Sequence, residues 1–492
     1  MPKLYTRVLL AVLAIALFRV SLPAQADVGT VAGSVASVQS LRVSANHRYL
    51  VRKDGTPFFY LADTAWELFH RLSKGDIDYY LRNRADKGFT VIQATLLAED
   101  NGLSVKNAEG ELPLLNFDPA TPNDKYFRLV DYTVDKAAAD GLYTALLPTW
   151  GSWVDGKPHR IWEGRKVFNA RNAYLYGLFL GKRYATKPNI IWVLGGDRSP
   201  VGHMEIWNAM AKGLREGDGG RHLITYHPGG GTSSSQFLSK ASWLDFNMLQ
   251  VGHYRFNGDD AEAVQHDYNS QPTRPVVDGE TTYEDMPVDT LPQNPRFKAY
   301  DVRKAAYWAV FAGAMGHTYG HNSVWQMHRK GDVPIDGARI EWMKALDAEG
   351  SSEMVHLRDL MESRPYLTRI PDQSLILPNV QTIGRDSDHV QITRDGVVGQ
   401  NDATYIFAYF PVLKYFGINT SIIPSSTLRA WWYNPRNGES RLIGALKNDG
   451  DFSPKTDQLP QASEGGPDWI LVIDDASKGY PAPGRNLQNR TK

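Results

Sequence analysis

The sequence predicts an α/β protein in two parts, a (β/α)8 barrel over residues 41–362 and a smaller all-β sandwich over residues 366–478. Within the first part, apolar segments alternate with helical segments about eight times over roughly 270 residues, which is the pattern and size of such a barrel. In the second part, helical segments give way to short alternating runs typical of a sandwich. A doubly wound open sheet is the alternative, but no glycine-rich dinucleotide or phosphate motif is present.

The first 26 residues have the composition of a signal peptide. Lys3 and Arg7 precede an apolar run at 8–18, and the small residues at 24–26 form a cleavage site. That run is too short to span a bilayer. We therefore expect residues 1–26 to be removed from a periplasmic or secreted monomer that has no membrane anchor.

The bulk composition excludes several classes of protein. The chain has no cysteine, so disulfides, thiolate metal ligands and a cysteine nucleophile are excluded. Its formal net charge is zero, which gives no indication of nucleic-acid binding.

The predicted elements follow one another in the order that a barrel requires. A hairpin is indicated by Asp54-Gly55, and its second run continues into the first barrel strand, which ends near 62–66. The next strands are expected at 90–97, 143–150, 189–197, 223–227, 245–253, 275–280 and 316–325. Helices between and after them are expected at 74–87, 124–140, 170–186, 204–216, 234–240, 260–269, 296–314 and 337–362. Strands of the sandwich are expected at 374–377, 390–393, 404–409, 428–433 and 469–473.

The segment at 189–198 is the most informative of these. Its apolar run is rich in β-branched residues, as in a strand buried on both faces of a parallel sheet. It ends in Gly195-Gly196-Asp197-Arg198, and glycines there allow the backbone to turn and a ligand to approach closely. Asp197 could instead cap the following helix, since Asp is a favoured N-cap residue.

Two predicted strands carry a carboxylate at the end where barrels have their active sites. Asp197 ends the fourth strand and Glu280 the seventh. Two carboxyl groups across a barrel mouth can hydrolyse a glycosidic bond without a metal, one as acid and the other as nucleophile or base. We therefore predict that Asp197 and Glu280 are catalytic. Glu280 could alternatively pair with Arg198, and Glu99 and Glu284 are the reserve carboxylates.

Other strand ends carry aromatic and polar side chains suited to a sugar ring and its hydroxyls. Asp63 could instead form a structural ion pair. If Arg198 lay beside the Asp197 carboxylate, it would favour the ionised form of Asp197, which suits a general acid poorly; an Arg198 that points to the outer layer would not. No H-E-x-x-H or similar spacing is present, so we predict neither a metal site nor a cofactor. The predicted substrate-binding residues are Asp63, Trp66, Gln93, Trp150, Arg198, His227, His253, Tyr319, His321 and Trp325.

Four motifs occur in the order found in one known family: Asp-Thr-Ala-Trp at 63–66, Leu-Gly-Gly-Asp-Arg at 194–198, Asp-Gly-Glu at 278–280 and Gly-His-Thr-Tyr-Gly-His-Asn-Ser-Val-Trp at 316–325. On these residues the chain resembles the apiosidase-like proteins, family 140 of the glycoside hydrolases, and its tail resembles the β-domain attached to many members, which carries a collagen-binding label. The resemblance implies a barrel that removes apiose-capped side chains from the pectin rhamnogalacturonan II, with Asp197 and Glu280 as the catalytic pair. The analogy with other barrel glycosidases favours a retaining mechanism.

Two other functions are alternatives. A non-catalytic glycan-binding surface protein would need the aromatic side chains at the mouth of the barrel but not both carboxylates. A collagen-adhesive protein is suggested only by the label of the tail.

Overall fold

The computed structural model describes residues 38–158, 164–256, 258, 260–377, 388–413, 416–460 and 465–485. The expected signal peptide at 1–26 lies outside the described residues. Among the described residues, no helix has the length and apolar character needed to cross a membrane.

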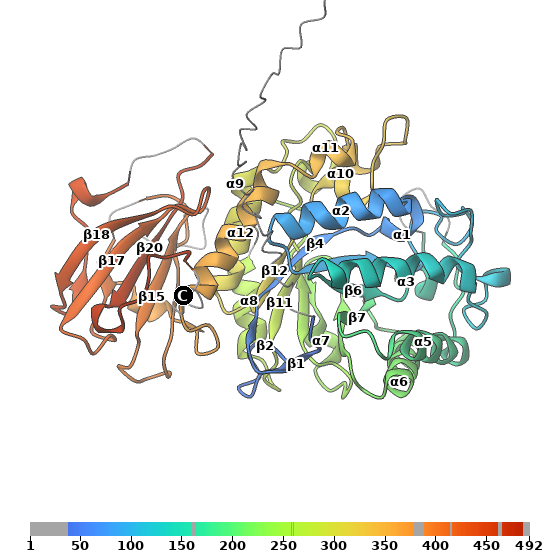
Figure 1. The fold of residues 1–492 in the computed structure, drawn as a ribbon, viewed down its shortest axis with the longest axis horizontal. Coiled ribbons are helices and arrows are strands. Elements are labelled where there is room, and N and C mark those ends of the chain that lie inside the picture. The colour runs from blue at the N-terminus through green and yellow to red at the C-terminus, as the bar shows by residue number, and fades with distance from the viewer. Residues whose placement is uncertain are drawn as a thin grey trace, which may run out of the picture. The chain divides into compact units, whose positions relative to one another are not determined.

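Eight parallel strands of the described chain form a nearly closed barrel, with helices around it (Figure 1). Strands that follow one another pair from β4 to β8 and from β10 to β12, and the first strand, β4, pairs with the last, β12. Between β8 and β10 the Asp245 backbone N–H donates to the Ile224 carbonyl at 2.9 Å. A two-residue strand, β9 (Thr232–Ser233), pairs antiparallel with β10. The barrel strands are β4 (Tyr60–Thr64), β5 (Val91–Thr95), β6 (Tyr143–Leu147), β7 (Ile190–Gly195), β8 (Leu223–His227), β10 (Asn247–Gln250), β11 (Val276–Glu280) and β12 (Gly316–Tyr319).

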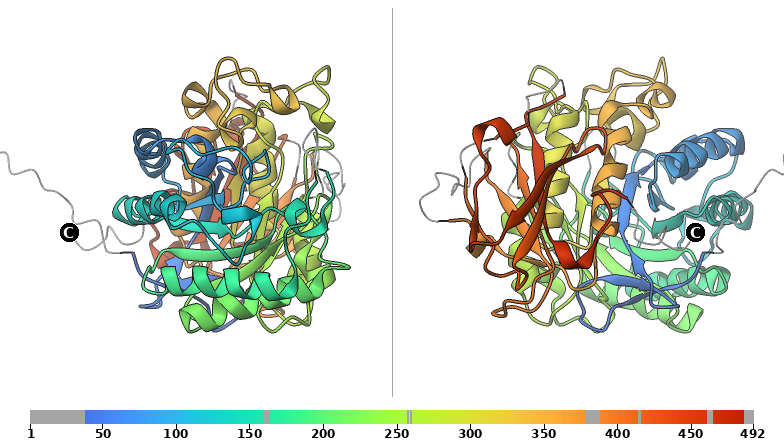
Figure 2. Two further views of the ribbon diagram at one scale, coloured as in Figure 1. Left: turned by 90° about the vertical axis from the view of Figure 1, so that its right-hand side faces the viewer. Right: turned by 60° about the vertical axis from the view of Figure 1, so that its left-hand side comes forward.

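The helices of the outer layer cover the strands from outside, and Figures 1 and 2 show α5 and α6 side by side. Ser73 begins α2 with a capping box to Asp76, and Asn169 begins α5 with another to Asn172. The main helices are α2 (Lys74–Asp86), α3 (Asp124–Ala139), α5 (Ala170–Tyr184), α6 (Met204–Asp218), α7 (Ser234–Leu238), α8 (Asp260–Asn269) and α9 (Ala299–Phe311). The barrel predicted from the sequence is therefore confirmed.

Two predicted boundaries differ from the structure. The eighth strand ends at Tyr319, and α10 (Asn322–Trp325) follows, because the His321 side chain accepts a hydrogen bond from the Ser323 backbone N–H at 3.0 Å and begins a helix. The predicted helix at 337–362 consists of α11 (Trp342–Ala345) and α12 (Glu349–Glu362). Before the barrel, β1 (Leu41–Val43), β2 (Leu50–Arg52) and β3 (Pro57–Phe58) form a small antiparallel sheet.

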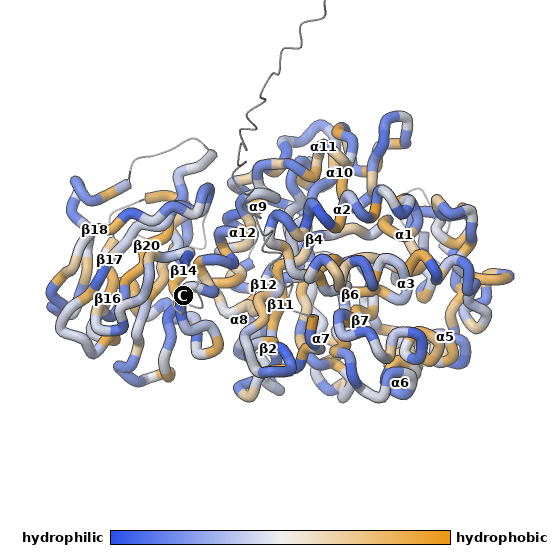
Figure 3. Tube along the Cα trace, in the orientation of Figure 1, coloured by the Kyte–Doolittle hydropathy of each residue, from blue (hydrophilic) through white to orange (hydrophobic). Residues whose placement is uncertain are grey.

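The C-terminal part is an antiparallel β domain, and alternation along its strands explains how it packs. In β15, Ile406, Ala408 and Phe410 face the core of the domain, whereas the residues between them pack against the barrel. In Figure 3 the strands of this domain carry both apolar and polar residues. The six-stranded sheet has the order β13 (Ile370–Pro371), β14 (Gln391–Arg394), β15 (Tyr405–Phe410), β20 (Trp469–Asp475), β17 (Thr427–Tyr433), β18 (Ser440–Lys447), and β16 (Ile418–Asn419) pairs with β19 (Asp451–Phe452). The predicted strand at 374–377 is a 3-10 turn at Gln373–Leu375.

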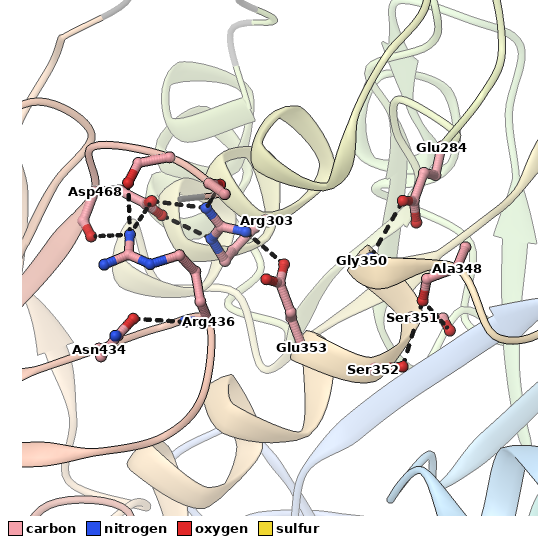
Figure 4. A network of polar contacts seen from close by, with 12 residues as sticks. Glu284, Arg303, Ala348, Gly350, Ser351, Ser352, Glu353, Asn434, Arg436 and Asp468 are labelled. Atoms are coloured by element: carbon pink, nitrogen blue, oxygen red, sulfur yellow. Dashed lines mark hydrogen bonds and ion pairs between the residues drawn. The ribbon is translucent and has the colours of Figure 1, made fainter. Parts of the chain in front are cut away.

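A buried ionic network connects the β domain to the barrel helices (Figure 4). Asp468 is fully buried and accepts hydrogen bonds from Arg303 of α9 at 2.7 and 2.8 Å and from Arg436 at 2.9 Å. Arg303 also pairs with Glu353 of α12. Two helices of the barrel and two segments of the β domain therefore meet at one set of charges.

Candidate active site

Strands β7, β8 and β11 bring Asp197, His227 and Glu280 together at the C-terminal end of the barrel. One oxygen or nitrogen of each side chain lies within 4.8 Å of those of the other two. The two carboxylates predicted from strand ends are thus close to each other. These donor types and this spacing could also hold a metal ion, and His227 and Glu280 lie within ion-pair distance of each other, at 3.0 Å.

The chain reaches Asp197 through a strained turn. Gly195, Gly196 and Asp197 have φ angles of +93°, +104° and +61°, in the region that side chains rarely adopt. A Cβ on Gly195 would lie 2.2 Å from the His227 carbonyl oxygen, and one on Gly196 would lie 2.9 Å from the Gly151 nitrogen. The turn is held from both sides, because Gly196 donates to the His227 carbonyl at 3.1 Å and accepts from the Gly151 N–H at 3.0 Å. Asp197 is not an N-cap, since α6 begins after His203.

Replacing Gly196 by alanine is expected to lower kcat/KM by about 100-fold, because the displaced turn moves Asp197, and to cost about 1–3 kcal/mol of stability. Gly202→Ala is the matched control: Gly202 also has a positive φ, of +82°, but a Cβ there meets nothing within 4 Å. The control should lose similar stability and keep its activity. Equal kinetic loss in both variants would contradict the role of the turn.

Glu280 is held as a carboxylate by two histidines. His227 Nε2 lies 3.0 Å from Oε2, and His253 Nε2 lies 3.0 Å from Oε1. The Asp197 backbone N–H donates to His227 Nδ1 at 3.4 Å, so the proton of a neutral His227 ring lies on Nε2, the nitrogen that faces Glu280. Burial alone would raise the pKa of Glu280, but these hydrogen bonds and charges outweigh burial and hold that pKa well below its usual range.

Aromatic rings surround the pair. Trp66 lies 5.3 Å, centroid to centroid, from both Trp150 and His227, and Tyr283 packs on His253 at 4.4 Å. Burial, and then the charge of Glu280, raise the pKa of Tyr283 well above its usual range. Sequence reasoning missed Tyr283 because it lies three residues beyond the end of β11, where alternation no longer indicates the direction of a side chain.

Gln93 lies beneath the pair. It is fully buried, and its Nε2 donates to the Gly279 carbonyl at 3.0 Å, beside Glu280. Its Oε1 accepts from Tyr60 at 3.0 Å. Gln93 therefore fixes the backbone that carries Glu280.

The remaining predicted substrate-binding residues have partners elsewhere. Asp63 is fully buried and pairs with Arg84 of α2 at 3.5 Å. Arg198 pairs through Nε with Asp155 of α4 (Ser152–Asp155) at 3.2 Å, so its guanidinium does not lie on the Asp197 carboxylate. His321 caps α10. Direct contact of these three side chains with a substrate stays a prediction.

Tyr319 and Trp325, two further predicted substrate-binding residues, also have partners of their own. Tyr319 donates to Glu284 at 2.6 Å, and Trp325 donates to Asn322 at 3.3 Å. Glu284 also accepts from the Gly350 N–H at 3.2 Å (Figure 4). The reserve carboxylate Glu284 is therefore part of the framework that joins the barrel to α12.

Similar structures define the class of the protein. A solved glycoside hydrolase shares 34% identity with a TM-score of 0.81, over 90% of this chain and 98% of that one. A glycoside hydrolase family 5 structure from Bacteroides vulgatus ATCC 8482 shares 32% identity with a TM-score of 0.81, over 90% and 95% of the two chains. A third structure, described as "a putative glycoside hydrolase" from the same strain, shares 15% identity with a TM-score of 0.61, over 90% and 83% of the two chains, and is similar in fold. The protein is a glycoside hydrolase.

Comparison with protein families is more specific. The family described as "Apiosidase-like, catalytic domain" matches residues 44–368, so the chain belongs to it. The domain described as "Putative collagen-binding domain of a collagenase" matches residues 370–474. A comparison with curated protein sequences gives no match.

Proposed function

We propose that the protein hydrolyses glycosidic bonds of pectic glycans by a retaining mechanism and releases apiose-capped side chains. The observation that supports retention is the distance between the carboxylates, with an oxygen of Asp197 within 4.8 Å of one of Glu280. Retaining enzymes have their carboxyl groups about 5–5.5 Å apart, whereas inverting enzymes leave about 6.5–9.5 Å for a water molecule.

Each carboxylate has one role in this mechanism. Glu280, kept ionised by His227 and His253, attacks the anomeric carbon, while Asp197 protonates the leaving oxygen. A covalent glycosyl-enzyme forms, and the aglycone leaves. Asp197 then removes a proton from water, which attacks the same carbon and frees Glu280.

Family membership supports the pectic substrate, and a panel of glycans tests it. Wild-type protein and the Glu280→Gln variant are incubated with pectin-derived oligosaccharides and apiose-bearing glycosides, and the released sugars are identified by chromatography. We expect release from the apiose-bearing members by the wild type alone. Equal release by the variant would contradict the assignment of Glu280. Glycan binding without any release would favour the alternative of a non-catalytic glycan-binding protein.

Export to the periplasm or the medium is part of the same proposal, since pectin fragments are large and extracellular. N-terminal sequencing of the protein from a bacterial periplasm should give a chain that begins near Asp27. A chain that still begins at Met1 would contradict export by cleavage of the leader.

Replacing His253 by alanine is expected to move the acidic limb of the kcat/KM profile to higher pH. Glu280 must be ionised to attack, and losing one of its two histidine donors raises its pKa toward the ordinary value. Activity should then be lost earlier as the pH falls. His203→Ala, at the start of α6, should leave the limb in place. An unmoved limb in His253→Ala would show that this hydrogen bond does not set the pKa of Glu280.

A further inference from the structure

A pocket lies beside β10, the strand that pairs with the one carrying Glu280. Its volume is about 490 Å³, within the range of small-molecule sites. It lies between the loop after β8, the end of β10 and α8. Its lining includes Gly231, Gln236, Gln250, Tyr254, Glu262 and His266.

Tyr254 lines this pocket and directly follows His253, whose Nε2 lies 3.0 Å from Glu280. A Cβ on Gly230 would lie 2.5 Å from the Tyr254 hydroxyl oxygen, and one on Gly252 would lie 2.7 Å from its ring, so the ring rests on two glycine backbones. The residue is 59% exposed. Partial burial, and then the charges of Asp197 and Glu280, raise its pKa. One exposed aromatic face therefore lines the pocket.

The floor of the pocket is continuous with the strand that carries Glu280. Gln250 is the register partner of Glu280 across β10 and β11, and the Val251 N–H donates to the Glu280 carbonyl at 2.9 Å. Gln250 is only 4% exposed, yet its Oε1 has no hydrogen-bond partner among the residues that the structure describes. A buried acceptor of this kind is costly unless a ligand or water donates to it.

From this geometry we infer that the pocket is a second sugar subsite, which holds the residue of the same glycan next to the bond that is cleaved. The inference rests on the proposed function. The Tyr254 ring supplies a flat apolar surface for one face of the sugar, and Leu249, Val251 and Ala263 add apolar lining. Gln236, Gln250 and Glu262 supply acceptors and donors for its hydroxyls.

The test measures binding separately from cleavage. The full-length Glu280→Gln variant is titrated calorimetrically with the glycan panel, alone and combined with Tyr254→Ala, Tyr254→Phe or Gln236→Ala. We expect Tyr254→Ala to raise the Kd about tenfold for fragments of two or more sugars. Tyr254→Phe keeps the ring and should restore the affinity. Tyr79→Ala removes another exposed tyrosine, on α2 and 47% exposed, and should leave the Kd unchanged.

The outcomes separate this inference from the proposed function. Unchanged binding in both Tyr254→Ala and Gln236→Ala, together with normal cleavage by the wild type, would overturn the subsite and leave the hydrolase assignment intact. Weakened binding in Tyr254→Ala, without cleavage of any glycan by the wild type, would support the subsite and contradict the proposed substrate. An equal loss of affinity in Tyr79→Ala would also overturn the subsite.

Discussion

The Glu280→Gln variant is expected to lose about 10⁴-fold or more of the wild-type kcat, because a neutral amide cannot attack the anomeric carbon. Gln has the same shape, so the melting temperature should change little. Asp197→Asn removes the general acid and base and should cost about 10²–10⁴-fold. Initial rates and circular dichroism of the same preparations check both expectations.

Glu284→Gln is the matched control for Glu280→Gln. Glu284 is a buried carboxylate four residues further along the chain, and it accepts hydrogen bonds from Tyr319 and Gly350. Burial raises its pKa, and a Gln side chain keeps the shape of its carboxyl group. This variant should stay within about tenfold of wild-type kcat. If both variants lost activity equally, the catalytic role would not belong to Glu280 alone.

Replacing Asp468 by alanine is expected to lower the free energy of unfolding by about 3–5 kcal/mol. Arg303 has no side-chain exposure and Arg436 only 7%, and both would lose a fully buried anion. Urea and thermal unfolding measure the change. Asp449→Ala removes an exposed partner of Lys447 and should cost at most about 1 kcal/mol.

Similar losses in Asp468→Ala and Asp449→Ala would show that the network in Figure 4 does not hold the β domain on the barrel. A selective loss in Asp468→Ala would instead support a role of the β domain as a structural support for the catalytic barrel.

The eight barrel strands could be predicted because each is an apolar run bounded by a clear signal. Ser73 caps α2, and Gly88 and Gly141, both with positive φ, lie just after the ends of α2 and α3, where glycine commonly ends a helix. The strand β18 could not be predicted, because its exposed residues lack strict alternation. The eighth strand was predicted too long, since the cap made by His321 depends on a side-chain hydrogen bond that apolar periodicity does not show.

The proximity of Asp197 and Glu280 could be predicted from strand ends, but the direction of most other side chains there could not. His227 and His253 lie on Glu280, whereas Asp63 lies against Arg84 in the outer layer. Residues that contact Glu280 and residues that point to the outer layer both follow an apolar run, so the sequence does not distinguish them, and only tertiary packing does. The pocket beside Tyr254 depends on two loops and α8 meeting in space, which no single segment of the sequence indicates.

The central claim is that Asp197 and Glu280 act together across one glycosidic bond with retention. It is tested most directly by proton NMR of the first sugar released from the apiose-bearing glycan that the panel identifies. The spacing of the carboxylates predicts that this sugar appears with the anomeric configuration of the substrate and mutarotates afterwards. Initial release of the opposite anomer would contradict the mechanism.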